Sequence, residues 1–489
     1  MTKSSFAAVD LGATSGRVAL GTFAPEGFTL DEVHRFANTP IIIDGVLCWD
    51  VQYLFEETLT GLARAYTRVA QCGSTLAGIA VDSWGVDYGI VDQTNSLVAP
   101  VRHYRAAEDS FVELANEMVS SSEAYARTGI TELPINTCFQ FIRDVRLGLL
   151  QPGVTALLTP DLWTAWLTGV RGAERTIAST TGLLDWTNHE WAVDLMERWG
   201  IPDTVVANIV ETGSLAGPTL TTVTKRIGAR NPIPVYRAPA HDTASAFAAV
   251  TSVSSDVAVV SCGTWALVGR LNATAVLTKD AEQAGFTNEV AADGSSLLIR
   301  NLSGTWLLEE CLRIWSAAGA GANASGKIDT LTEAPTETWS LRTHLLVAAE
   351  KESARVQGTI DCGAPELIGT RDMPTEISAL YRRSHENTEL TRPQIVRLIL
   401  ESLAESFAVT IARTKEITGS PLREIIMIGG GSLIEHLVAL TEQATGLPVR
   451  VGHPEATSIG NICVQAVSAG LFDTMDQARA ATHAQQKEN

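Results

Sequence analysis

Two stretches that share one pattern, about half a chain apart, constrain the fold of this sequence most. In the first, Ala8 to Gly21 (AVDLGATSGRVALG), an apolar run ends on Asp10 and a glycine-containing turn leads into a second apolar run. In the second, Asp256 to Gly269 (DVAVVSCGTWALVG), an apolar run reaches Gly263-Thr264 and a second apolar run follows. Each stretch predicts two strands joined by a tight turn. Their repetition indicates two similar lobes, each starting with such a hairpin.

The turns could bind an anion, because a tight glycine turn can point its backbone N–H groups outward. Asp10, at the end of the first strand, could hold a metal ion that carries the same anion. An ordinary hairpin with a surface acid fits the first stretch equally well. A third turn, Gly429 to Ser432, follows the apolar run Ile425 to Ile428 and precedes a helical pattern. It favours a nucleotide contact at a helix start, although a close backbone crossing would also need glycine.

The composition fits a large globular protein without nucleic-acid or membrane partners. A chain of 489 residues is too long for one core, so we expect two domains. With 36 basic and 55 acidic side chains the net charge is -19, which opposes binding to nucleic acid or anionic membranes. The sequence contains no apolar run of transmembrane length and no signal-like N-terminal core, so we expect a cytoplasmic protein. The seven cysteines are scattered without a CxxC pair, which predicts reduced, mostly buried thiols.

The first domain has a recognisable order of elements. After the first hairpin, Phe28 to Phe36 has the pattern of a third strand, a helical pattern starts at Asp50, and Leu76 to Val81 has the pattern of a buried strand. Strand–strand–strand–helix–strand is the order of an actin-like, ribonuclease-H-like α/β domain.

The triplet His241-Asp242-Thr243 is the main candidate for chemistry. It separates an apolar segment from a small-residue helical pattern, near the end of the first lobe. Asp242 is the candidate general base that removes a hydroxyl proton. Asp242 and Thr243 could instead only cap the helix. His241 could orient the base or touch a substrate, although its position alone is more typical of a structural histidine.

The sequence resembles the FGGY family of carbohydrate kinases over about residues 8 to 470. The motifs that carry this resemblance are AVDLGATSGR from Ala8, DSWGVD from Asp82, AHDTASA from Ala240, SCGTW from Ser261, RNLSG from Arg300, IGGGS from Ile428 and PEATSIGN from Pro454. The glycine turns are shared by actin-like ATPases, whereas DSWGVD, HDTASA and PEATSIGN are more specific.

The resemblance implies a fold, a reaction and a set of site residues. The fold is α/β, with two actin-like (ribonuclease-H-like) domains, 1–244 and 245–489, and a catalytic cleft between them. The first domain would bind the sugar and carry the first phosphate loop, and the second would bind the nucleotide. The reaction is ATP- and Mg²⁺-dependent phosphorylation of L-rhamnulose to L-rhamnulose 1-phosphate in rhamnose catabolism. Asp242 would be the proton acceptor. The sugar would meet Gly85, His241, Asp242, Thr243 and Asn301; ATP would meet Ala13, Thr14, Ser15, Gly16, Arg17, Thr264, Glu309, Gly430 and Gly431.

Two other functions stay open. The stretch Ala106 to Asp109 departs from the family's pattern, so another ketose or polyol, such as fuculose or xylulose, could be the substrate. The glycine turns would also suit a non-catalytic actin-like nucleotide binder, such as a sensor, but such a protein needs no base like Asp242. The expected partners are a small sugar and ATP, with both a monomer and a homodimer compatible with the sequence.

Overall fold

The computed structural model describes residues 3–250, 256–319, 336–351, 356, 358–367, 370, 372–385 and 389–483. The chain forms two compact α/β units. Unit 1 consists of residues 1–253, 271–298 and 455–489, and unit 2 of residues 254–270 and 299–454. The expected division at 244/245 falls inside helix α9 (Asp242–Val250). Neither unit is one continuous stretch of the sequence. For example, helix α16 (Ala456–Ser468), late in the chain, packs on the sheet of unit 1.

Unit 1 is built on a mixed six-stranded sheet. Its strand order is β13 (Leu215–Pro218), β14 (Pro234–Tyr236), β6 (Thr75–Ser83), β1 (Ser4–Leu11), β2 (Ser15–Ala24) and β3 (Gly27–Ala37). Strands β1, β2 and β3 form an antiparallel meander, and β1 also pairs in parallel with β6. The predicted strand–strand–strand–helix–strand order is confirmed.

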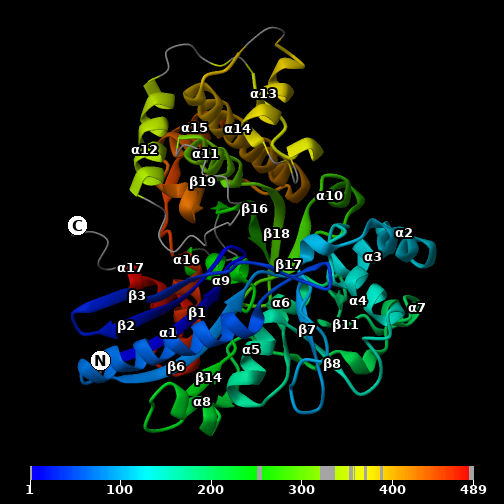
Figure 1. Cartoon of the computed structure of the whole chain (residues 1–489), viewed down its shortest axis with the longest axis vertical. Coiled ribbons are helices and arrows are strands. Elements are labelled where there is room, and N and C mark those ends of the chain that lie inside the picture. Colours follow the sequence, from blue (N-terminus) through cyan, green and yellow to red (C-terminus); the bar gives the residue numbers. More distant parts are fainter. Residues whose placement is uncertain are drawn as a thin grey trace. The chain divides into compact units, whose positions relative to one another are not determined.

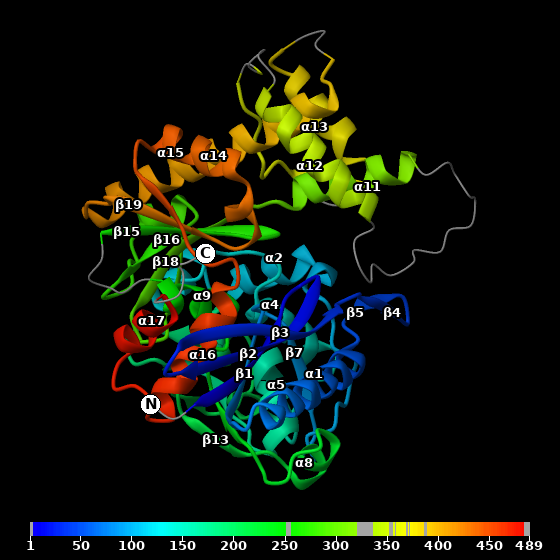
Figure 2. The same ribbon diagram turned by 90° about the vertical axis from the view of Figure 1, so that its left-hand side faces the viewer.

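Helices cover both faces of this sheet. Helix α1 (Val51–Gln71) begins where predicted, because the Asp50 side chain accepts a hydrogen bond from the Tyr53 backbone. Its apolar side packs in one core with Ala7, Val9 and Leu11, which point to one face of β1, and with helix α5 (Thr159–Thr168). Helix α16 lies against β1 and against α9 on the other face. Figures 1 and 2 both show α16, in red, beside the blue strand β1.

The remaining elements of unit 1 are short. They are β4 (Ile41–Ile43), β5 (Val46–Cys48), β7 (Tyr88–Val91), η1 (Tyr104–Ala106), α2 (Asp109–Met118), α3 (Ser121–Thr128), α4 (Thr137–Arg146), β8 (Thr155–Leu158), β9 (Ala173–Glu174), α6 (Arg175–Ser179), β10 (Leu184–Asp185), β11 (Glu190–Trp191), α7 (Val193–Arg198), η2 (Asp203–Val205), β12 (Ile209–Val210), α8 (Thr221–Arg226), α10 (Lys279–Gln283) and α17 (Met475–His483).

The second sheet repeats the strand arrangement of the first. Its order is β17 (Thr287–Val290), β18 (Ser296–Ser303), β16 (Trp265–Asn272), β15 (Val257–Cys262), β19 (Glu424–Ile428) and β20 (Val449–Val451). Strand β15 is antiparallel to β16 and parallel to β19, as β1 is antiparallel to β2 and parallel to β6. The internal repeat predicted from the two hairpins is therefore present in the strand pairing.

Helices of unit 2 share a second core with its sheet. They are α11 (Trp306–Gly319), α12 (Thr336–Lys351), η3 (Pro365–Leu367), α13 (Met373–Arg382), α14 (Arg392–Thr418), η4 (Gly430–Leu433) and α15 (Glu435–Thr445). Helix α14 starts at a capping box of Thr391 and Gln394 and ends at Gly419, which has a left-handed φ of 62°. All seven cysteines are free thiols and six of them are buried, as expected. No helix within the described ranges is long and apolar enough to cross a membrane.

Candidate active site

A cluster of acids forms where strands β1 and β6 of unit 1 end. Asp10 and Asp82 are register partners in this parallel pair. Their side chains therefore project from neighbouring strands, and such strands lie about 4.8 Å apart. Ser83 forms a bridge to His241, which places Asp242 next to the same sheet end. Burial raises the pKa of Asp82 well above its usual value, and the charges of Asp10 and Asp242 add to this effect. Three carboxyl groups from distant parts of the chain therefore interact here.

Residues of the PEATSIGN segment complete this cluster. The Arg17 guanidinium donates to Asp10 at 2.8 Å and also pairs with Glu455. The amide of Asn461 donates to Asp82 at 2.5 Å. Burial opposes the charged form of Arg17, but the two acids outweigh it and raise its pKa. The predicted ATP contact Arg17 is thus held by acids in this structure.

Asp242 is the first residue of helix α9 and is only partly buried. Its side chain is 33% exposed, whereas that of Asp10 is 3% exposed. The surrounding protein raises the pKa of Asp242, the His241 charge opposes this shift, and the Asp10 charge adds to it. A carboxylate with a raised pKa and open access is suited to take a proton. The predicted neighbour Thr243 donates its hydroxyl to Asp242 at 3.2 Å.

His241 lies between two acids. Its Nδ1 is 2.8 Å from Glu289 and its Nε2 is 3.4 Å from Asp242. Burial lowers the pKa of the ring, but Glu289, Asp242 and Glu174 outweigh burial and raise it to about 9. This shift favours the protonated, cationic form of the ring. The backbone on its N-terminal side is fixed, since the Ala240 N–H donates to buried Glu174 at 3.0 Å.

Gly85, a predicted sugar contact, lies in a strained loop that begins in the DSWGVD motif. A Cβ on Gly85 would lie 3.1 Å from the Thr180 hydroxyl, so this position is tight. Val86 has a left-handed φ of 69°, which is rare for a β-branched residue. Asp87 fixes the loop by accepting the indole N–H groups of Trp49 at 2.6 Å and Trp84 at 2.9 Å. Burial raises the pKa of Asp87 to about 7, although these hydrogen bonds act to lower it.

The first glycine turn is shaped by packing as well as by its loop. The Gly12 N–H donates to the Ser15 carbonyl at 2.9 Å and closes the turn. A Cβ on Gly16 would lie 2.3 Å from the ring of Phe36, its partner on β3. Glycine at position 16 is thus required by sheet packing. Of the neighbouring predicted ATP contacts, Thr14 is exposed, and Ala13 and Ser15 are half-buried.

The second turn, in unit 2, is supported by Gly304. The Gly263 N–H donates to the Trp265 carbonyl at 2.8 Å, with Thr264 at the tip. A Cβ on Gly304 would lie 2.4 Å from the Gly263 carbonyl oxygen and 2.7 Å from that of Thr264. The Thr305 N–H donates to the same Gly263 carbonyl at 2.9 Å. The sequence motif RNLSG therefore ends at a glycine that fixes this turn.

Two of the three consecutive glycines pack tightly against Cys262, and the third has free space around it. A Cβ on Gly429 would lie 2.7 Å from the Cys262 carbonyl oxygen, and one on Gly431 would lie 2.4 Å from the Cys262 Sγ. Gly430 is exposed and has nothing within 4 Å of its Cβ position. The close backbone crossing considered above is therefore present at Gly429, whereas Gly431 packs against the Cys262 side chain. The 3-10 helix η4 includes Gly430 and Gly431 and ends at Leu433, and α15 starts only at Glu435.

Two further predicted residues lie in unit 2. Glu309 forms an ion pair with Arg342 at 3.5 Å, which partly neutralises the acid. Asn301, on β18, is exposed and belongs to unit 2, whereas Gly85, His241, Asp242 and Thr243 belong to unit 1.

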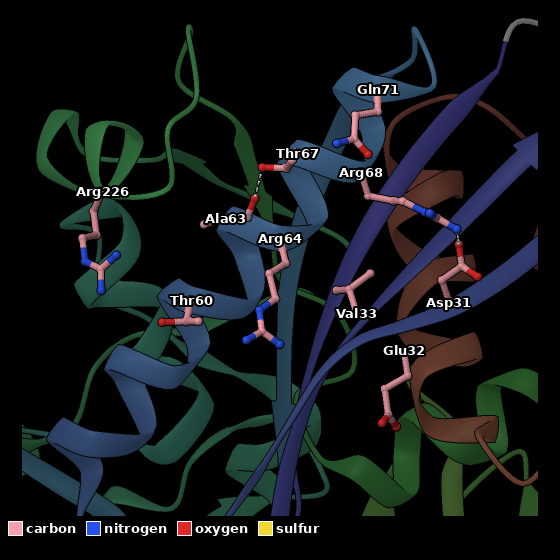
Figure 3. Close-up of a pocket in the computed structure, with 10 residues that line it drawn as sticks. All are labelled: Asp31, Glu32, Val33, Thr60, Ala63, Arg64, Thr67, Arg68, Gln71 and Arg226. Atoms are coloured by element: carbon pink, nitrogen blue, oxygen red, sulfur yellow. Dashed lines mark hydrogen bonds and ion pairs between the residues drawn. The ribbon is translucent and has the colours of Figure 1, made fainter.

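One open groove lies away from this cluster. It has a volume of about 620 Å³ and lies between β3 and α1, where Arg64, Arg68 and Arg226 are among its lining residues (Figure 3). Arg68 pairs with Asp31 at 3.8 Å and Arg226 with Glu56 at 3.0 Å. None of the predicted site residues lines this groove, so we do not assign the reaction to it.

Comparison with protein families identifies the group to which the chain belongs. The model of the FGGY family of carbohydrate kinases, N-terminal domain, matches residues 6–249, and that of the C-terminal domain matches residues 258–469. The chain belongs to the FGGY family of carbohydrate kinases. It is therefore a phosphotransferase whose acceptor is an alcohol group, and membership of a kinase family implies the use of ATP.

Curated relatives of this FGGY kinase cover almost the whole chain. It is 33% identical to a rhamnulokinase of Bacteroides thetaiotaomicron over 96% of this chain and 91% of that protein. It is 31% identical to a rhamnulokinase of an Enterobacter species over 98% and 92% of the two chains.

Solved structures of family members share the fold of this FGGY kinase. A xylulose kinase from Rhodospirillum rubrum superposes with a TM-score of 0.75 at 18% identity, covering 97% of this chain and 92% of that chain. Plasmodium falciparum glycerol kinase with ADP gives a TM-score of 0.73 at 14% identity, covering 98% and 92%. These similarities confirm the two-domain α/β fold.

The acid cluster of the FGGY kinase suits a cation that takes one or two carboxylates and keeps most of its water and phosphate ligands. Asp82 Oδ1 is buried without a hydrogen-bond partner in the structure. Within the described ranges, no group of three or more His, Cys, Asp or Glu residues could chelate a metal ion. Mg²⁺ is commonly bound by one or two carboxylates with water and phosphate oxygens completing its shell. Asp10, whose carboxylate pairs with Arg17 at 2.8 Å in this structure, stays the predicted holder of the ion.

The sequence did not reveal several residues that position the candidate base. Glu174 and Glu289 are buried acids that touch the His241 segment, and neither lies in a motif considered above. Glu455 and Asn461 lie in PEATSIGN, but nothing in the spacing indicated that they meet Arg17 and Asp82.

Proposed function

We propose that this FGGY kinase phosphorylates L-rhamnulose at its 1-hydroxyl, with Asp242 as the general base. The observation that carries this proposal is the position of Asp242: an accessible carboxylate at a helix start, 3.4 Å from the His241 ring and within the influence of the Asp10 charge. The choice of L-rhamnulose is supported by the rhamnulokinases that match nearly the full chain. Cytoplasmic location and a monomer or homodimer stay predictions.

In the proposed reaction the sugar hydroxyl oxygen attacks the γ-phosphorus of ATP. The new oxygen–phosphorus bond forms as the bond from γ-phosphorus to the bridging oxygen breaks, and ADP leaves with that electron pair. The hydroxyl proton passes to Asp242. Bound Mg²⁺, held through Asp10, would neutralise phosphate charge. His241, Thr243 and Gly85 would orient the sugar, and Asn301 is proposed as a further contact.

Nucleotide binding is proposed for the glycine turns. Thr264, Gly430 and Gly431 in unit 2, and Ala13 to Arg17 in unit 1, would donate to phosphates or contact the nucleoside. Glu309 is proposed to face the ribose or the base. Its ion pair with Arg342 would reduce the repulsion between this acid and the phosphates.

The test is the identity of the product. Incubation with ATP, Mg²⁺ and L-rhamnulose is expected to give a sugar phosphate whose ³¹P and ¹³C NMR spectra place the phosphate on carbon 1. Phosphate on another carbon, or no product, would contradict the assignment. Faster conversion of fuculose or xylulose would favour the alternative substrate, and ADP binding without turnover would favour a sensor.

Replacement of Gly304 by alanine tests the nucleotide turn. Because the new Cβ would press on backbone oxygens 2.4 and 2.7 Å away, we expect the turn to shift and the Kd for ADP to rise about tenfold, which is about 1.4 kcal/mol. Gly263→Ala is the matched comparison, since its Cβ would lie 3.8 Å from the Trp265 carbonyl oxygen. Titration calorimetry should show the larger loss for Gly304→Ala. Equal losses, or none, would contradict this account of the turn.

A further inference from the structure

Glu289 faces the candidate base through one intervening ring. Its carboxylate lies 2.8 Å from Nδ1 of His241, and Nε2 of the same ring lies 3.4 Å from Asp242. The Glu289 and His241 side chains are only 10% and 9% exposed. Glu289 and His241, both nearly buried, are thus linked by two short contacts to the accessible carboxylate of Asp242.

The backbone around Glu289 is fixed on both sides. The N–H of Asn288 donates to the Gly129 carbonyl at 2.8 Å, and the N–H of Val290 donates to the Ser179 hydroxyl at 2.9 Å. The Asn288 side chain is fully buried and accepts the Val276 N–H at 2.7 Å. Strand β17 therefore presents Glu289 to His241 from a rigid position, as a preorganised site requires.

The charge of Glu289 decides the charge of the ring. Burial alone lowers the pKa of His241, and Glu289 is the strongest of the groups that raise it to about 9; Asp242 and Glu174 are the other facing acids. Without Glu289 the buried ring would lose its main counter-ion and favour the neutral form. Burial raises the pKa of Asp242, the His241 charge opposes this shift, and the Asp10 charge adds to it.

We propose that Glu289 is a positioning residue that holds His241 as a cation directed at Asp242 and thereby keeps Asp242 unprotonated before the reaction. This inference rests on the proposed role of Asp242. It assigns to strand β17, which lies in the region matched by the C-terminal family model, a function in the acid cluster of unit 1.

The test is the pH dependence of kcat/KM for Glu289→Gln, which keeps the side-chain shape and removes the charge. We expect the acid limb of the profile to move to higher pH by about one unit, since Asp242 then holds its proton longer. The loss should therefore be about tenfold at the acid end and should shrink towards about pH 9. The exposed acid Asp280 provides a charge-matched control, and Asp280→Asn should leave the profile unchanged.

A second variant separates a charge effect from a structural one. With His241→Asn as the background, adding Glu289→Gln should not shift the acid limb further, because the intervening ring is gone. An unshifted acid limb in Glu289→Gln would overturn the inference. This holds whether the activity of the variant is unchanged or is lower at all pH values. So would an equal further shift in the His241→Asn background. Near-normal turnover of Asp242→Asn would instead overturn the base assignment itself, so the two failures can be told apart.

Discussion

Replacing Asp242 by asparagine is expected to lower kcat for sugar phosphorylation by about 10²- to 10⁴-fold, the usual contribution of a general base. Asparagine keeps the shape of the side chain but cannot take the hydroxyl proton. Asp242 is the partly exposed acid beside His241, at the start of α9, so few structural contacts depend on its charge. Sugar-dependent ADP release, measured at saturating ATP, gives the effect directly.

The same preparation should still bind nucleotide. The Kd for ADP should stay within about threefold of that of the unaltered enzyme, because the hydrogen bonds that close the Gly12 and Gly263 turns do not involve Asp242. Asp203→Asn removes an equal charge at an exposed position and should leave kcat unchanged. Near-normal kcat for Asp242→Asn would remove Asp242 as the base.

Replacing Gly460 by alanine is expected to be the most destabilising of the single changes considered. A Cβ at this position would lie 1.8 Å from the Ser245 carbonyl oxygen and 3.2 Å from the Ala249 backbone nitrogen. Helices α16 and α9 touch here through their backbones, so no side chain can move aside. We expect a loss of about 3 kcal/mol or more, at the upper end of overpacking effects. The unfolding temperature should fall by about 5 °C or more.

This change should also reduce activity, because α9 begins with Asp242. A displacement of the helix would move the base, and about 1 Å of misplacement can cost about a hundredfold in rate. Ser468→Ala, a change at a half-buried position of the same helix, should alter stability by at most about 0.5 kcal/mol. Differential scanning calorimetry and kcat measured well below the transition provide the two readouts. Unchanged stability for Gly460→Ala would contradict the close helix crossing.

Local patterns in the sequence were sufficient to predict many of the elements. The strands around the Gly12 and Gly263 turns and the Asp50 cap of α1 follow from apolar periodicity, turn residues and a capping residue. Each of these signals lies within a few residues of the element it predicts, so no tertiary contact was needed.

Contacts between distant segments were not predictable in this way. Arg17 pairs with Glu455 across 438 positions, and Asn461 reaches Asp82 across 379. Glu289 is a single acid on a four-residue strand, and only the fold brings it to His241. The reasons for the glycines were also tertiary: the Phe36 ring at Gly16 and Cys262 at Gly429 and Gly431.

The most direct test of this account is kcat/KM for ADP release over a panel of sugars that includes L-rhamnulose, fuculose, xylulose and a polyol. We expect turnover to require a sugar and L-rhamnulose to give the highest kcat/KM. A clear preference for another sugar would contradict the assigned substrate, and nucleotide binding without any sugar-dependent turnover would contradict the assignment of a sugar kinase.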